Sequence, residues 1–224
     1  MRLALLLAVA SIGGGACAGN PPPNVSAAGR VETDTSAVLR LGAGNHRLGH
    51  GCPVSERIAI TNAHVVLTNR EFSRAGNFDD PPQLFLWATR DDTFTGKTGH
   101  VQIDQYRDLA WIESTTGPFP HWYPIASEAP KSGERLSFVG YDFRSRRLAY
   151  AERLLTGTML RLSVGRLVYR IEEGVPGSSG SCVFNERGEV VGVNAAFSEL
   201  QNGEIVGIGV SVAGMPIPEA GAQQ

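Results

Sequence analysis

Short apolar stretches separated by turn-forming residues follow one another along most of this chain. The stretch Arg57-Ile58-Ala59-Ile60-Thr61 has its isoleucines at alternate positions, the pattern of a strand with one buried face. Further runs of strand length lie at 38–41, 83–87, 101–104, 109–112, 136–141, 155–162, 167–171, 183–184, 190–194 and 205–212. Because there are 27 glycines and turns fall at short intervals, barrels or sandwiches are favoured over helices. The sequence therefore predicts an all-β protein.

One cluster of turn residues divides the predicted strands into two groups. Residues 116–120 contain one glycine and two prolines, which interrupt regular structure. A chain of 224 residues is long enough for one large β domain or for two barrels that share an interface. We therefore place an N-terminal unit at 37–117, a C-terminal unit at 118–217 and a short tail at 218–224.

The first 18 residues have the features of an export signal. Arg2 supplies a positive charge, and the apolar run from Leu3 to Ile12 has the length of a signal sequence core, which is too short to span a bilayer. We predict a signal peptide at 1–18 and a flexible tether at 19–36, a segment with three consecutive prolines and no apolar periodicity. No other segment is long and apolar enough to be a transmembrane helix.

Two processing routes remain open around Cys17. Ala16-Cys17-Ala18 fits the small-x-small site of ordinary signal cleavage. Gly14-Gly15-Ala16-Cys17 also resembles a bacterial lipobox, in which Cys17 would be acylated, although leucine is usual where Gly14 stands. We therefore expect an exported protein that is periplasmic, lipid-anchored at the envelope or secreted. Its contact with a membrane is expected only through a lipid anchor at Cys17.

Composition and charge narrow the class of partner. Hydrophobic residues make up 42% of the chain and charged residues 19%, which is enough apolar material for a sizeable globular core. The net charge is −2, and no long basic or acidic run is present. The sequence therefore gives no reason to expect binding to nucleic acid.

Three short motifs carry the candidate chemistry. Thr61-Asn62-Ala63-His64-Val65-Val66 offers a histidine, Arg107-Asp108-Leu109-Ala110 an aspartate, and Pro176-Gly177-Ser178-Ser179-Gly180-Ser181 a serine between glycines. Each motif alone is a weak signal, but the order His, Asp, Ser is that of one serine-nucleophile triad. An α/β-hydrolase is set aside, because its serine comes first and its elbow ends in glycine where Ser181 stands. The other histidines, His46, His50, His100 and His121, lack such a context and are assigned no role.

The residue types fit the chemistry of nucleophilic catalysis. A serine hydroxyl needs an adjacent base, which a neutral imidazole supplies, and a carboxylate fixes the imidazole tautomer. These roles point to Ser179, His64 and Asp108 in turn. The developing oxyanion needs backbone N–H donors, and glycine permits the tight turn that presents them. We therefore predict an oxyanion hole formed by the N–H groups of Gly177 and Ser179.

The same motifs resemble those of the bacterial chymotrypsin-fold serine peptidases, over roughly residues 37–217. The stretch 176–181 looks like the nucleophile loop of HtrA-type proteases, and 188–196 and 207–210 are similar to the two strands that follow it; 183–186 is also similar to the staphylococcal glutamyl endopeptidase. The resemblance implies two six-stranded antiparallel β-barrels with the active site between them. The PDZ domain that usually follows in HtrA proteases is not expected here.

The resemblance also bears on the cysteines and on two departures from the family. Without Cys17, an exported protein would keep Cys52 and Cys182, and in the family the two segments that carry them approach each other, so we expect a disulfide. Ser178 replaces the acid of trypsin relatives, which argues against a zymogen switch that pairs a new N-terminal amine with that acid. Ala195 replaces a serine or threonine whose hydroxyl helps to hold the triad aspartate.

Clues to the specificity pocket conflict. Glu173 stands six residues before Ser179, where trypsin relatives carry the acid that binds Lys or Arg side chains. Asn194 and Ile208 look like the HtrA pocket, which accepts small or medium aliphatic residues. Glutamyl endopeptidases have a histidine where Asn194 stands and a threonine where Gly174 stands, so cleavage after Glu is not expected. We favour small aliphatic residues, with basic residues second.

These observations predict an exported serine endopeptidase that acts on polypeptides through an acyl-enzyme and needs no metal or cofactor. Two alternatives stay open. One is a non-catalytic binding protein of the trypsin fold, against which the complete triad argues. The other is an esterase that uses the same site on non-peptide acyl groups.

Overall fold

A computed structural model of the chain describes residues 34–43, 46–67, 85–88, 95–142, 151–174 and 177–220. The predicted signal peptide at 1–18, with Cys17, lies outside the described residues, as do most of the predicted tether and the last four residues of the tail. All structural statements below concern the described part of the chain.

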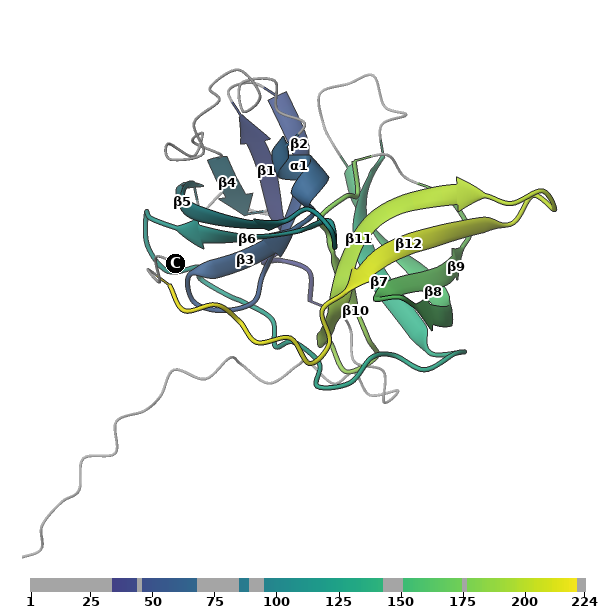
Figure 1. The fold of residues 1–224 in the computed structure, drawn as a ribbon. Coiled ribbons are helices and arrows are strands. Elements are labelled where there is room, and N and C mark those ends of the chain that lie inside the picture. The colour runs from purple at the N-terminus through teal and green to yellow at the C-terminus, as the bar shows by residue number, and fades with distance from the viewer. Residues whose placement is uncertain are drawn as a thin grey trace, which may run out of the picture.

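The described strands form two closed six-stranded barrels, as predicted (Figure 1). Paired strands run antiparallel throughout both barrels. The first barrel has the order β1-β2-β3-β6-β5-β4, with β1 Leu39–Ala43, β2 His46–Pro53, β3 Ile58–Thr61, β4 Phe85–Ala88, β5 Thr95–Asp104 and β6 Leu109–Ser114. The second has the order β10-β11-β12-β9-β8-β7, with β7 Arg135–Asp142, β8 Ala151–Ser163, β9 Arg166–Ile171, β10 Cys182–Phe184, β11 Val190–Glu199 and β12 Ile205–Ser211.

Each barrel closes around the apolar faces of its own strands. In β9, Leu167, Tyr169 and Ile171 are buried at alternate positions, as expected of side chains that point to one face of a strand. The ring of Tyr169 meets that of Phe138 edge-on, with centroids 5.7 Å apart. Burial of each such side chain stabilises the fold by about 1.5–3 kcal/mol. In the first barrel Leu39, Leu41, Ala59, Val65, Val66, Ala110, Ile112 and Phe119 form the corresponding core.

A third apolar cluster joins the two barrels. Cys52 and Ile60 reach it from the first barrel, and Cys182 and Phe184 reach it from the second. The predicted disulfide lies in this cluster, where Cys52 and Cys182 are bonded with their Cα atoms 5.1 Å apart. Tyr123, from the segment between the barrels, packs edge-on against Phe184 at 4.8 Å. The barrels therefore share a packed and covalently linked interface.

The one described helix, α1, consists of the five residues Ala63–Leu67. It lies on the side of the first barrel that faces the second (Figure 1). Ala63, Val65 and Val66 are its buried residues. Within the described residues no helix has the length and apolar character needed to cross a membrane.

Candidate active site

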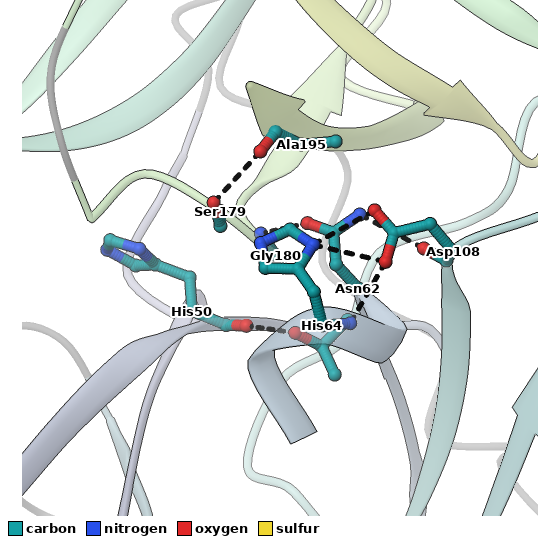
Figure 2. A network of polar contacts seen from close by, with 8 residues as sticks. His50, Asn62, His64, Asp108, Ser179, Gly180 and Ala195 are labelled. Atoms are coloured by element: carbon teal, nitrogen blue, oxygen red, sulfur yellow. Dashed lines mark hydrogen bonds and ion pairs between the residues drawn. The ribbon is translucent and has the colours of Figure 1, made fainter. Parts of the chain in front are cut away.

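His64 comes from the short helix that follows β3. β3 ends at Thr61 and α1 begins at Ala63, so His64 lies in the first turn of α1 while its neighbours in the helix are buried. The side chain of His64 is 41% exposed to solvent, and it lies between Asp108 and the loop that carries Ser179 (Figure 2). The burial of Ala63 and Val65 on either side fixes where this imidazole can point.

Asp108 lies in the turn between β5 and β6, directly before Leu109. Its φ is 59°, a left-handed conformation that aspartate tolerates better than most residues. The backbone N–H of His64 donates to Asp108 Oδ1 at 2.9 Å, and His64 Nδ1 lies 2.9 Å from Oδ2 and 3.1 Å from Oδ1. Because a carboxylate only accepts, Nδ1 carries the hydrogen, and Nε2 of the neutral ring is left as the acceptor.

These contacts determine the charge state of Asp108. Burial of the carboxyl acts to raise its pKa, but the hydrogen bonds from the ring and backbone of His64 act in the opposite direction. The positive charges of Arg166 and of His64, when its ring is protonated, also lower this pKa. The net effect is a pKa below the usual value for aspartate, so the carboxyl is ionised at neutral pH. Ala195 has no hydroxyl that could bind Asp108. The backbone N–H of His64 does donate a hydrogen bond to this carboxylate.

Ser179 lies in a tight turn of the second barrel that begins and ends at glycine. Gly177 and Gly180 both have φ of 82°, which confirms that the turn needs the left-handed region at both positions. The Ser179 hydroxyl donates to the carbonyl of Ala195 at 3.0 Å, and Figure 2 shows it directed toward that carbonyl. Ala195 lies at an irregularity between Asn194 and Ala196 in the pairing of β11 with β12.

The Ser179 turn is tied to the first barrel through its backbone. Ser179 O accepts from His50 N–H at 2.8 Å, and Gly180 N–H is shared between Asn62 Oδ1 at 2.7 Å and Asn194 O at 2.8 Å. A Cβ atom on Gly180 would lie 2.0 Å from the carbonyl oxygen of His50, closer than any real contact allows. Glycine is therefore required at position 180 by both its dihedral angle and its neighbours.

Asn62 links the segments that carry His64, Asp108 and Ser179. It is fully buried two residues before His64. Its Nδ2 donates to the Asp108 carbonyl at 3.2 Å, while its Oδ1 accepts from Gly180 N–H (Figure 2). Asn62 belongs to the predicted histidine motif, but no role was predicted for it. The signal available in the sequence was a polar residue directly after the alternating strand 57–61.

A second buried amide supports the turn from the other side. Asn194 Oδ1 accepts from the Tyr169 hydroxyl at 2.5 Å, and Asn194 Nδ2 donates to Ser178 Oγ at 2.8 Å. Burial raises the pKa of Tyr169 far above its usual value, so its hydroxyl keeps its proton. Ser178, which stands in place of the acid of trypsin relatives, thus has a partner inside the second barrel. This network was not predicted from the sequence.

The three predicted pocket residues lie in the second barrel. Glu173 follows β9, Asn194 lies on β11 and Ile208 lies on β12. Glu173 is half-buried just after β9, and Ile208 pairs with Ala196 across β11 and β12. The aromatic ring of Phe197 lies directly on Gly174, where a Cβ atom would come within 2.2 Å of the ring. The role of Glu173, Asn194 and Ile208 in specificity stays a prediction. Phe197 was not predicted to have a role there.

The site combines a carboxylate-bound imidazole on one barrel with a serine hydroxyl on the other. Among the described residues, no group of three or more His, Cys, Asp or Glu side chains is arranged to hold an ion. The imidazole and the hydroxyl are suited to acid–base and nucleophilic chemistry.

Comparisons with known proteins agree with this architecture. The sequence model for the trypsin-like peptidase domain matches residues 49–193. The MamO protease domain from Magnetospirillum magneticum, in its apo form, is similar in structure with a TM-score of 0.58 at 21% identity, over 80% of this chain and 94% of that one. The serine endoprotease from Yersinia pestis has a TM-score of 0.58 at 18% identity, over 80% and 60% of the two chains. Glu endopeptidase in complex with MPD has a TM-score of 0.63 at 15% identity, over 80% and 86%. At these identities the structural likeness shows a shared fold.

Proposed function

Since the chain belongs to the family of trypsin-like peptidase domains, whose model matches more than half of its length, we propose that it is an exported serine endopeptidase with His64, Asp108 and Ser179 as its catalytic triad. The single observation that carries this proposal is the pairing of His64 with both carboxylate oxygens of Asp108, beside the turn of Ser179. That pairing leaves Nε2 as the basic nitrogen of the ring.

The proposed reaction begins with a rotation of the Ser179 side chain. In its present position the hydroxyl donates to Ala195 O, and a turn about its Cα–Cβ bond directs it to His64 Nε2. The hydroxyl oxygen then attacks the scissile carbonyl carbon while His64 takes the proton. The oxyanion that forms is stabilised by the N–H groups of Gly177 and Ser179.

Collapse of this intermediate breaks the peptide C–N bond, and His64 returns its proton to the leaving amine. The acyl group remains on Ser179 as an ester. A water molecule, deprotonated by His64, hydrolyses the ester and restores the serine hydroxyl. Asp108 stays ionised throughout and stabilises the imidazolium, in keeping with its lowered pKa.

We propose small aliphatic residues as the preferred residue before the scissile bond. The ring of Phe197 lies against Gly174, the residue next to Glu173. In the proposed pocket, a ring at this position would leave less room for a long side chain, which supports the aliphatic preference. Phe197→Ala should shift cleavage toward larger aliphatic side chains in a peptide library. Strong cleavage after Arg or Lys that Glu173→Ala abolishes would overturn the aliphatic preference.

Export is proposed from the signal sequence and is supported by the disulfide, which persists in oxidising compartments. Acylation and removal of Cys17 are distinguished by Cys17→Ser. If Cys17 is acylated, this substitution releases the protein from membranes. An unchanged distribution with a mature N-terminus at Gly19 identifies ordinary signal cleavage.

The test of the catalytic proposal is covalent labelling with a fluorophosphonate, followed by peptide cleavage. The unaltered protein should label, whereas Ser179→Ala and His64→Ala should lose turnover by several orders of magnitude. Ser163→Ala, at an exposed serine on β8, is the matched control and should label normally. Labelling that persists in Ser179→Ala contradicts the assignment. Absence of labelling identifies a binding protein, and labelling with cleavage of esters alone identifies an esterase.

A further inference from the structure

His50 makes contacts that its place in the sequence gave no reason to expect. It lies on β2 of the first barrel, and it is fully buried. Its ring Nδ1 lies 2.8 Å from the carbonyl oxygen of Gly177, and its backbone N–H donates to the carbonyl of Ser179 at 2.8 Å. Its own carbonyl accepts from Thr61 Oγ1 at 2.6 Å. His50 thus holds the Ser179 turn at two points and is itself held from β3.

The two contacts differ in what they require of residue 50. Any residue other than proline could supply the backbone N–H that binds Ser179 O. The bond to Gly177 O, by contrast, needs a side chain that places a hydrogen-bond donor where Nδ1 of His50 lies. Because a carbonyl only accepts, Nδ1 of His50 carries the hydrogen in this contact. The imidazole therefore makes a specific bond that the fold alone does not provide.

The His50 ring binds Gly177, a residue type whose backbone can adopt many conformations. Glycine has more backbone freedom than any other residue, and Gly177 uses it to adopt φ of 82°. Its N–H is one of the two proposed oxyanion donors. The bond from the His50 ring holds the carbonyl group of Gly177. The bond from the His50 backbone N–H holds the carbonyl group of Ser179, the residue that supplies the second proposed donor. Fixed donors are effective because they need no reorganisation when the charge develops.

We propose that the imidazole of His50 is a positioning residue that preorganises the oxyanion hole by holding the Gly177 carbonyl. This proposal rests on the serine-peptidase mechanism proposed above. His50 is not assigned a role as a second base, because its ring is fully buried and its Nδ1 hydrogen goes to a neutral carbonyl. The ring of His64 is instead bound to a carboxylate, which stabilises an imidazolium. Its effect is on the transition state, since the oxyanion is absent from the bound substrate.

The test compares His50→Ala, His50→Asn and His50→Gln. Asparagine can place its amide N–H close to where Nδ1 of histidine lies, whereas glutamine carries its amide one carbon further out. Outright removal of an oxyanion donor costs about 10²–10³ in kcat, and we expect a loosened donor to cost about 10- to 100-fold in His50→Ala with KM changed less than about twofold. His50→Asn should recover most of this loss, and His50→Gln should not.

The readouts are kcat and KM on a peptide p-nitroanilide with alanine before the scissile bond, and the affinity of the matching peptide boronate. A boronate bound to Ser179 places an oxygen in the oxyanion hole, so its affinity should fall by about the same factor as kcat. A purely structural role for His50 would not produce this correlation. The comparison of the Asn and Gln variants stands even if His50→Ala fails to fold.

Three results would overturn the proposal. The first is a kcat for His50→Ala close to that of the unaltered protein. The second is a His50→Asn variant no better than His50→Gln. The third is a loss of kcat without a loss of boronate affinity. If the unaltered protein does not react with a fluorophosphonate, the catalytic proposal and this one fail together, whereas normal labelling with any of the three results removes His50 alone.

Discussion

Replacement of Gly180 by alanine tests how tightly the two barrels meet at the Ser179 turn. An added Cβ would lie 2.0 Å from His50 O and 2.2 Å from Thr61 Oγ1, whereas carbon atoms in contact are normally about 3.5–4.0 Å from their neighbours. The turn must therefore move away from β2 by more than about 1 Å. That movement disrupts the bonds from Gly180 N–H to Asn62 and from His50 N–H to Ser179 O.

The magnitude follows from two contributions. The left-handed backbone costs alanine about 1–2 kcal/mol. The two broken hydrogen bonds add about 1 kcal/mol each, so that the free energy of unfolding should fall by about 3–4 kcal/mol in total. Gly133→Ala is the matched control, because Gly133 has φ of 87° but open space around its Cβ position. It should lose only the backbone contribution.

The assay is urea unfolding of both variants together with fluorophosphonate labelling. A shift of Ser179 by about 1 Å should slow labelling by about 100-fold in Gly180→Ala, while Gly133→Ala labels at the normal rate. If Gly180→Ala and Gly133→Ala lose equal stability and both label normally, the close approach between the turn and β2 is wrong.

Three further perturbations test the surrounding structure. Removing the disulfide with Cys52→Ala and Cys182→Ala should cost about 5 kcal/mol in the chain-entropy model, because the bond closes a separation of 130 residues; two thiols that alkylate without reduction would contradict the bond. Asn62→Leu should cost about 2–3 kcal/mol and lower kcat, since the Asp108 carbonyl and Gly180 N–H each lose a partner; a free energy of unfolding equal to that of the unaltered protein would contradict the linking role of Asn62. The pKa of Asp108 is lowered in the folded state, so its stabilising effect should be present at neutral pH and be lost as the pH falls through that lowered pKa. The test compares the stability of Asp108→Asn with that of the unaltered protein. An equal difference at pH 7 and pH 3 would refute the effect.

A strand could be predicted from the sequence where buried and exposed side chains alternate. The end of a strand could not be predicted where only backbone pairing with a neighbouring strand maintains it. β9 was predicted almost to the residue, because its buried side chains alternate. β11 was predicted to end at Asn194 but continues to Glu199, and its last four residues are exposed. Those residues pair with β12 through the backbone, which leaves no mark in the pattern of apolar positions.

The candidate site divides in a similar way. His64, Asp108 and Ser179 could be named as candidates because the chemistry of a catalytic triad requires particular side chains in a particular order. His50 and Asn62 act on backbone groups, the Gly177 carbonyl and the Gly180 N–H, which lie 127 and 118 positions further along the chain. Every residue offers a carbonyl, so the sequence holds no signal for which one a distant side chain will bind.

The disulfide also determines how the molecule would carry a mechanical load. A pull on the two chain ends passes along β1 and β2 to Cys52, crosses the sulfur bridge to Cys182, and leaves through β10. The strands from β3 to β9 lie inside the closed loop and cannot be extended while the bridge is intact. His64, Asp108 and Ser179 all lie within this loop. Stretching can therefore peel the outer strands, but only reduction of the bridge allows tension to reach the chain that carries these three residues.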